Sequence, residues 1–263
     1  MDINKETIIT TEKYIHVKHG SEKLFVCLHG YTSNKEELYN LFSDFFRDEK
    51  YDFLIIDAPF NDEITGNGKQ WFSLVENPES VKTDEQLDLY KLNLDNMDAK
   101  YCYNQISRSG LDNVLNNQLF NDITKQYNEI NLFGFSQGAS VVLYWYLKNV
   151  DSRINSYVTI SCPYFSGMEN IKNSSQKDNI IVINLQKDTI LGKYSASKSG
   201  LPLNNKVILE CDNYPIPDIG HIPNKETITK IHMIITTFLQ NLELEKINQA
   251  KKYIYSSDPS IIK

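Results

Sequence analysis

A short apolar run at residues 130–135 ends in Gly-Phe-Ser-Gln-Gly at residues 134–138 and continues into the apolar residues 139–147. This order predicts a buried strand, a sharp turn and a helix, the local structure of a nucleophile elbow. A serine hydroxyl is a weak nucleophile, so it must stand clear of the backbone, where a base and N–H donors can reach the reacting groups. Gly134 and Gly138 lie where side chains would collide with the crossing strand and helix. We therefore predict that Ser136 is a nucleophile.

Other short apolar runs recur along the chain and alternate with polar stretches of helical length. A run that is apolar throughout is typical of a central strand covered on both faces of a parallel sheet. Besides the strand before Ser136, we expect strands at 24–28, 53–56, 156–161, 179–185 and 206–211, and edge strands within 7–18. This alternation predicts an α/β fold, a mostly parallel central sheet flanked by helices on both faces.

Apolar residues at helical spacing predict three further helices. The first begins at a cap, Ser33 or Asn34, and the last begins at Asn224. Their expected buried residues are Leu38, Leu41, Phe42, Phe45 and Phe46 in the first helix, Leu111, Val114, Leu115, Leu119 and Ile123 in the second, and Ile228, Ile231, Ile235, Phe238, Leu239 and Leu242 in the last.

The chain shows no linker between domains, so we expect a single domain over residues 1–248 and a polar C-terminal tail over 249–263. Residues 61–105 are rich in Asn, Asp, Glu and Gly, and they are longer than loops in compact folds usually are. We expect this segment to be a lid or cap over the site, with a plain surface insertion as the alternative.

Partners for Ser136 are expected where other parallel strands end, because function collects at the carboxyl edge of such a sheet. His221 follows the last predicted strand and precedes the last helix, and Asp188 follows the strand at 179–185. The order Ser, Asp, His is the one this type of elbow requires, with histidine as base and aspartate orienting it. Asp212 and Asp218 are alternative acids, since both lie nearer His221 in sequence.

An oxyanion formed at Ser136 needs backbone N–H donors. We predict that these come from Gln137, directly after the nucleophile, and from Tyr31, just after His29 and Gly30 at the end of the strand at 24–28. His29 is then expected to hold its loop by hydrogen bonds rather than to act as a base.

Composition excludes several classes of function. A net charge of -7, with scattered lysines, gives no basic face for nucleic acid. Residues 1–18 are polar and no apolar run reaches membrane-spanning length, so we expect a cytoplasmic protein without an integral membrane segment. The four cysteines lie far apart and are expected as reduced core thiols. His16 and His19 point to opposite faces of a strand and are expected at the surface rather than on a metal.

With these pieces in place, the chain resembles the phospholipase/carboxylesterase family of α/β-hydrolases, which includes acyl-protein thioesterases. The resemblance covers roughly residues 22–240, and its residues are Leu28-His29-Gly30, Ala58-Pro59, Gly68, Trp71-Phe72, Gly134 to Gly138, Asp188 and Gly220-His221. It implies hydrolysis of carboxylic esters or thioesters, with no metal and no cofactor.

The first hypothesis is thus a serine esterase or thioesterase that acts on a small-molecule or acylated substrate through an acyl-enzyme on Ser136. Trp71 and Phe72, with Tyr164 and Phe165, are candidate walls of an acyl site, unless these aromatics belong to the core. The alternatives are a serine peptidase or amidase and a non-catalytic binding protein on the same fold. Nothing in the sequence indicates the oligomeric state or the substrate.

Overall fold

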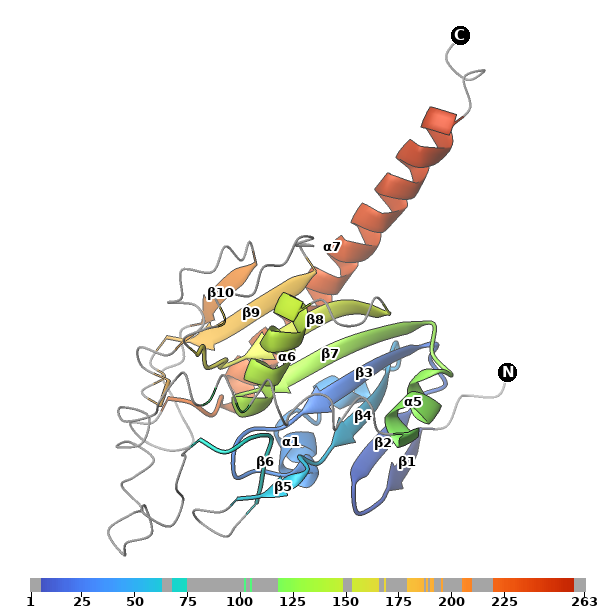
Figure 1. Ribbon diagram of the computed structural model, residues 1–263. Coiled ribbons are helices and arrows are strands. Elements are labelled where there is room, and N and C mark those ends of the chain that lie inside the picture. Colours follow the sequence, from blue (N-terminus) through green and yellow to red (C-terminus); the bar gives the residue numbers. More distant parts are fainter. Residues whose placement is uncertain are drawn as a thin grey trace, which may run out of the picture.

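The computed structural model describes residues 6–62, 68–74, 102, 105, 118–148, 153–165, 168, 179–186, 188, 190–191, 195, 205–209 and 220–257. Within them, one eight-stranded sheet has the order β1-β2-β4-β3-β7-β8-β9-β10 (Figure 1). Its strands are β1 (Thr7–Thr10), β2 (Tyr14–Lys18), β3 (Lys23–Leu28), β4 (Asp52–Ile56), β7 (Glu129–Phe135), β8 (Ile154–Ile160), β9 (Ile180–Leu185) and β10 (Lys206–Leu209). A separate hairpin consists of β5 (Phe60–Asn61) and β6 (Lys69–Gln70).

Among the described strands of the large sheet, two pairings at one end are antiparallel, β1 with β2 and β2 with β4. Every pairing from β4 to β10 is parallel. The register places Leu28 beside Gly134 and Phe135 beside Ile160. The residues that follow β3, β7, β8 and β9 therefore leave the sheet at one edge, where binding sites of parallel sheets form.

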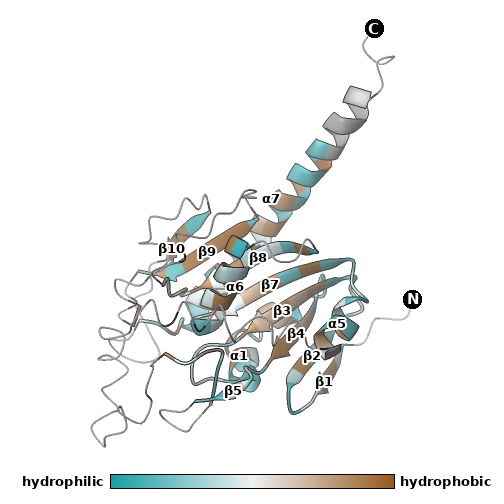
Figure 2. Cartoon of the chain, viewed as in Figure 1, coloured by the Kyte–Doolittle hydropathy of each residue, from teal (hydrophilic) through white to brown (hydrophobic). Residues whose placement is uncertain are grey.

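Side chains alternate between the two faces of the sheet along each strand, so both faces carry apolar residues. Helices cover both faces. Among the described residues, the helices with defined bounds are α1 (Lys35–Leu41), the 3₁₀ helix η1 (Phe45–Arg47), α5 (Gln118–Thr124), α6 (Gln137–Lys148) and α7 (Lys225–Ser257). One core cluster joins α5 and α6 to residues such as Leu24 and Val26, and the other joins α1, η1 and α7 to Phe25 and Cys27. Figure 2 shows hydrophobic residues concentrated in the central strands. The predicted α/β fold is confirmed.

The first predicted helix is shorter than its apolar spacing indicated. Asn34 is its cap and accepts a hydrogen bond from the Glu37 N–H at 2.8 Å. The helix ends at Leu41, and the last two phenylalanines of the predicted stripe lie in η1, although Phe42, Phe45 and Phe46 are all buried. Apolar spacing reports burial rather than a continuous helix, because a 3₁₀ turn also brings residues i and i+3 to one side.

The expectation that His16 and His19 lie at the surface is wrong, since both are buried. The His16 ring lies 2.9 Å from the Tyr127 hydroxyl, measured from Nε2, and that hydroxyl donates to Asp52. The His19 backbone N–H donates to the same carboxylate at 2.8 Å. Polar partners carried by other elements allow these histidines to be buried, and a single strand sequence does not reveal them.

The last helix begins after the predicted cap, where Asn224 accepts a hydrogen bond from the Thr227 N–H at 2.8 Å. It continues past Asn248 to Ser257, into the stretch that was expected to be a polar tail, and its distal part projects from the sheet (Figure 1). Lys, Gln and Ala in this stretch are good helix formers, which explains the extra length. Residues 258–263 and most of the predicted lid, 61–105, lie outside the described residues.

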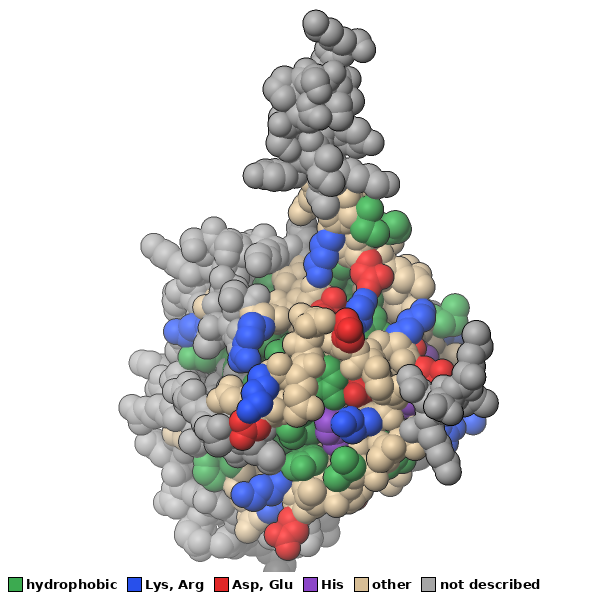
Figure 3. All heavy atoms as spheres, turned by 90° about the vertical axis from the view of Figure 1, so that its right-hand side faces the viewer, with side chains coloured by type: hydrophobic (Ala, Val, Ile, Leu, Met, Phe, Trp, Pro, Cys, Tyr) green, Lys and Arg blue, Asp and Glu red, His purple; other side chains and the backbone are tan. Residues whose placement is uncertain are grey.

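Three of the four cysteines, Cys27, Cys102 and Cys162, are described, and all three are free and buried, as expected. None of the described helices is both long enough and apolar enough to cross a membrane. On the face shown in Figure 3, basic and acidic side chains are interspersed, in keeping with scattered charges along the sequence.

Candidate active site

Ser136 occupies the sharp turn between β7 and α6. Its φ of 53° is in the left-handed region, a strained conformation for a residue with a side chain, and its N–H donates to the Ile160 carbonyl at 2.9 Å. A Cβ on Gly134 would lie 2.5 Å from the Gly138 carbonyl oxygen, and one on Gly138 would lie 2.4 Å from that of Leu28. The two glycines are thus required by the close crossing of strand and helix, for the reason inferred from the sequence.

The structure brings His221 against Ser136. His221 Nε2 lies 2.8 Å from Ser136 Oγ, and the imidazole packs on the Phe135 ring with 5.4 Å between ring centroids. The backbone carbonyl of His221 accepts a hydrogen bond of 3.4 Å from the Ser161 hydroxyl, which follows β8. Phe135 at the end of β7 and Ser161 just after β8 therefore both contact His221.

Asp188 completes a continuous hydrogen-bonded series. Its Oδ2 lies 2.7 Å from His221 Nδ1, and its Oδ1 accepts the Leu191 N–H at 3.0 Å. Because a carboxylate only accepts hydrogen bonds, this contact places the imidazole proton on Nδ1 and leaves Nε2 to accept from the serine hydroxyl. The alternative acids, Asp212 and Asp218, lie outside the described residues.

The loop after β3 passes directly beside the serine. A Cβ on Gly30 would lie 3.2 Å from Ser136 Cβ, and the Gly138 N–H donates to the His29 carbonyl at 3.1 Å. Tyr31 follows in this loop, and its hydroxyl donates to Asp62 at 2.5 Å. Among the described residues, none accepts a hydrogen bond from the Gln137 N–H. The predicted oxyanion donors are the N–H groups of Tyr31 and Gln137. The two segments that carry them therefore lie next to each other at Ser136.

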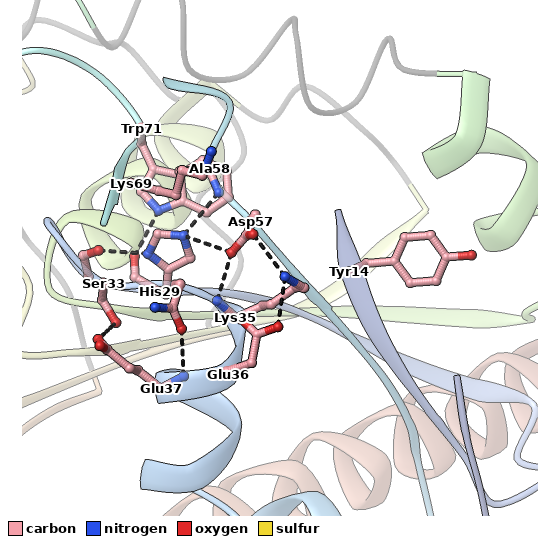
Figure 4. A network of polar contacts seen from close by, with 12 residues as sticks. Tyr14, His29, Ser33, Lys35, Glu36, Glu37, Asp57, Ala58, Lys69 and Trp71 are labelled. Atoms are coloured by element: carbon pink, nitrogen blue, oxygen red, sulfur yellow. Dashed lines mark hydrogen bonds and ion pairs between the residues drawn. The ribbon is translucent and has the colours of Figure 1, made fainter. Parts of the chain in front are cut away.

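His29 is buried and sits at the centre of the polar network in Figure 4. Its Nε2 accepts the Ala58 N–H at 2.9 Å, and its Nδ1 lies 2.7 Å from the Gly30 carbonyl oxygen. Burial lowers the pKa of His29 to about 4. The ring is thus neutral, and the nearby Asp57 carboxylate pairs instead with the Lys35 ammonium at 3.1 Å. These contacts agree with the loop-holding role expected for His29.

Trp71 and Phe72 lie in the core rather than on an open surface, as both have 0% exposure. The Trp71 indole N–H donates to the His29 carbonyl at 2.7 Å (Figure 4). Phe165 is also buried and packs edge-on against Phe72 with 5.8 Å between centroids, while Tyr164 is partly buried. These contacts join Trp71 and Phe72 to other parts of the core, and a role of the two residues in substrate binding stays a prediction.

Sequence reasoning missed the side chain of Gln137. Only its backbone N–H was assigned a role, whereas its amide is buried and hydrogen-bonded to the backbone of both Trp71 and Phe72. The specific spelling Gly-Phe-Ser-Gln-Gly was the available signal, because the elbow itself requires only the serine and the two glycines.

The fold agrees with that of several solved structures, among them an esterase and an acyl-protein thioesterase. Esterase PE8 is 20% identical with a TM-score of 0.53, and the match covers 83% of this chain and 93% of that one. YahD, solved with malic acid, is 13% identical with a TM-score of 0.57, covering 88% and 100%. Acyl-protein thioesterase 2 of Zea mays is 15% identical with a TM-score of 0.52, covering 90% and 99%. At these identities the likeness concerns the fold.

No curated protein sequence matches the chain significantly. The family model described as Phospholipase/Carboxylesterase, however, matches residues 12–240, which include the elbow and every residue of the candidate site. By this match and by its eight-stranded sheet, the chain belongs to the phospholipase/carboxylesterase family of α/β-hydrolases.

Proposed function

We propose that this protein is a serine hydrolase that cleaves carboxylic esters or thioesters through an acyl-enzyme on Ser136. The observation that carries the proposal is the series of two short contacts, Ser136 Oγ to His221 Nε2 at 2.8 Å and His221 Nδ1 to Asp188 Oδ2 at 2.7 Å. This is the arrangement in which a base can take the serine proton while a buried carboxylate orients it.

In the first half-reaction, Ser136 Oγ attacks the carbonyl carbon of the substrate as its proton passes to His221 Nε2. Negative charge develops on the carbonyl oxygen, and the N–H groups of Gln137 and Tyr31 stabilise it. His221 then gives the proton to the departing alcohol or thiol, and the acyl group stays on the serine. Asp188 stabilises the imidazolium that exists between these two proton transfers.

In the second half-reaction, water takes the place of the alcohol or thiol. His221 removes a proton from the water, the resulting hydroxide attacks the acyl carbon, and the collapse of the second tetrahedral intermediate returns the proton to Ser136. The products are a carboxylic acid and the free enzyme, so every proton is accounted for without a cofactor.

Esters and thioesters are favoured over amides by the family to which the chain belongs and by the esterase and thioesterase that share its fold. Carboxylesters, lysophospholipids and acylated proteins all present the bond that this chemistry requires. Triad geometry does not by itself fix the scissile bond, so the amide alternative belongs in the test.

The test is intact-mass spectrometry after treatment with a fluorophosphonate, which reacts preferentially with an activated serine. We expect a single adduct that maps to the Ser136 peptide and is absent from Ser136→Ala. Ser161→Ala is a matched control, because Ser161 also has a positive φ, 49°, at a neighbouring strand end, but its hydroxyl donates to the His221 backbone carbonyl rather than to the imidazole ring. This control should keep the adduct.

Esters and thioesters of graded chain length, compared with peptide amides, then define the substrate. We expect turnover of esters or thioesters and at least about tenfold slower turnover of amides, because an amide is the poorer acyl donor. Absence of an adduct on folded wild-type protein would contradict the proposal and favour a binding protein, and preferred amide turnover would favour a peptidase or amidase.

A further inference from the structure

The amide of Gln137 is buried and hydrogen-bonded at both ends. The side chain is 2% exposed, Oε1 accepts the Trp71 backbone N–H at 2.9 Å, and Nε2 donates to the Phe72 carbonyl at 2.8 Å. A backbone N–H can only donate and a carbonyl can only accept, so the orientation of this amide is determined by its partners. The residue after the nucleophile is thereby attached to the Trp71–Phe72 segment.

Trp71 in turn attaches that segment to the loop after β3. Its indole N–H donates to the His29 carbonyl at 2.7 Å, and the same carbonyl accepts the Gly138 N–H at 3.1 Å. Since Gly138 directly follows Gln137, the four residues form a closed ring of hydrogen bonds. The Trp71 side chain within this ring has 0% exposure, so water does not compete for the indole bond.

This ring joins the two segments that carry the proposed oxyanion donors, Gln137 on the elbow and Tyr31 two residues after His29. Oxyanion stabilisation requires both N–H groups to lie about 2.7–3.1 Å from one oxygen atom, so the separation of the two segments matters to the chemistry. We propose that the Gln137 side chain and the Trp71 indole are positioning residues, together the Gln137–Trp71 bridge, which sets this separation. The inference rests on the proposed function.

A buried amide with a purely structural role is available for comparison in the same strand and helix unit. Asn131 in β7 has 0% exposure, and its Oδ1 accepts the Ser156 hydroxyl at 2.7 Å. Its Nδ2 donates to the Leu24 carbonyl at 3.4 Å. Leu24 lies near the start of β3, at the opposite end of the strands from Ser136. Asn131→Leu and Gln137→Met therefore both remove a buried, hydrogen-bonded amide, but only one of them touches the bridge.

The first experiment measures kcat and KM for a p-nitrophenyl ester in Gln137→Met, Trp71→Phe, the double variant and Asn131→Leu, each normalised to folded protein. For the two bridge variants we expect kcat to fall about 10- to 100-fold with KM changed less than about threefold, because the oxyanion hole acts on the transition state. The double variant should lose little more than either single variant, since both break one ring. Asn131→Leu should be less stable but keep its kcat.

The second experiment follows the two indole N–H groups by nuclear magnetic resonance and needs no substrate. Trp145→Phe assigns the signals, and Trp145, whose indole has no acceptor among the described residues, is the internal reference. We expect Gln137→Met to move the Trp71 signal upfield and speed its exchange with solvent, and to leave the Trp145 signal unchanged. Asn131→Leu should leave both signals in place.

An unchanged kcat in both bridge variants, a loss matched by Asn131→Leu, or an unperturbed Trp71 indole in Gln137→Met would each overturn the bridge. If wild-type protein neither hydrolyses esters nor takes a fluorophosphonate label, the proposed function fails and the positioning role fails with it. The indole measurement would still report whether the hydrogen-bonded ring exists, so the two failures are distinguishable.

Discussion

His29 shows how burial determines the chemistry of a single residue. It lies 3.8 Å from the Asp57 carboxylate, measured from Nε2, yet its pKa is lowered to about 4 because loss of solvation outweighs that attraction. The Ala58 N–H already occupies Nε2, so a proton there would remove a hydrogen bond as well. The geometry therefore requires a neutral ring with its proton on Nδ1, facing the Gly30 carbonyl.

A pH dependence of stability follows from this residue. The unfolded chain protonates histidine near its ordinary pKa of about 6.5, whereas the folded protein does so only near about 4. Between these values the unfolded state binds more protons than the folded state. The free energy of unfolding therefore loses nothing to His29 above about pH 6.5, and it falls by on the order of 3 kcal/mol as the pH is lowered toward 4. Urea unfolding at pH 7, 5.5 and 4.5 measures the slope.

The matched variant is His29→Asn, whose amide can still donate to the Gly30 carbonyl but does not titrate. Its free energy of unfolding should be lower at pH 7 and less dependent on pH below 6.5. Burial also lowers the pKa of His16, but this residue titrates in both proteins and cancels in the comparison. Parallel curves for the two proteins would show that His29 is not the source of the slope.

At the scale of elements, the turn between β7 and α6 places strict demands on the backbone. Ser136 has a positive φ, and the glycines beside it approach backbone atoms of neighbouring segments rather than flexible side chains. Backbone cannot move aside without breaking the strand pairing or the helix, so the strain cannot be relieved locally. The conformation depends on β3, β7 and α6 together.

We expect Gly134→Ala to cost about 3 kcal/mol or more, because its methyl group would lie 2.5 Å from the Gly138 carbonyl oxygen. Gly30→Ala is the matched control, since its methyl group would come no closer than 3.2 Å, to Ser136 Cβ, and should cost less than about 1.5 kcal/mol. Thermal unfolding followed by circular dichroism compares the two. Equal stability of the variants would mean that the crossing is looser than described.

On the scale of the whole molecule, residues from four separate loops meet at the carboxyl edge of the sheet. Ser136 follows β7, Asp188 follows β9, His221 precedes α7, and Gly30 follows β3. The separation between His221 and Ser136 is 85 residues along the chain but 2.8 Å between side-chain atoms. Parallel pairing in register is what converts distant sequence positions into one site.

The identity of the acid provides the corresponding prediction. We expect Asp188→Asn to slow fluorophosphonate labelling of Ser136 by about 10³- to 10⁴-fold, because the amide would favour the wrong tautomer of His221. Asp212→Asn and Asp218→Asn should label within about threefold of wild type. A large loss in either of these, with Asp188→Asn near wild type, would reassign the acid.

Sequence patterns alone predicted most of the central strands and a serine-based chemistry. Continuous apolar runs predicted the central strands, and the pentapeptide around Ser136 predicted the elbow, because both patterns express local requirements of burial and backbone geometry. The burial of His16 and His19, the end of α1 at Leu41 and the contact of Asp188 with His221 became visible in the folded structure alone. The hydrogen bonds of Trp71 and Gln137 also could not be predicted from the local sequence. Each depends on partners far away in sequence, and a local pattern carries no record of which distant residue will supply a hydrogen bond or cover a side chain.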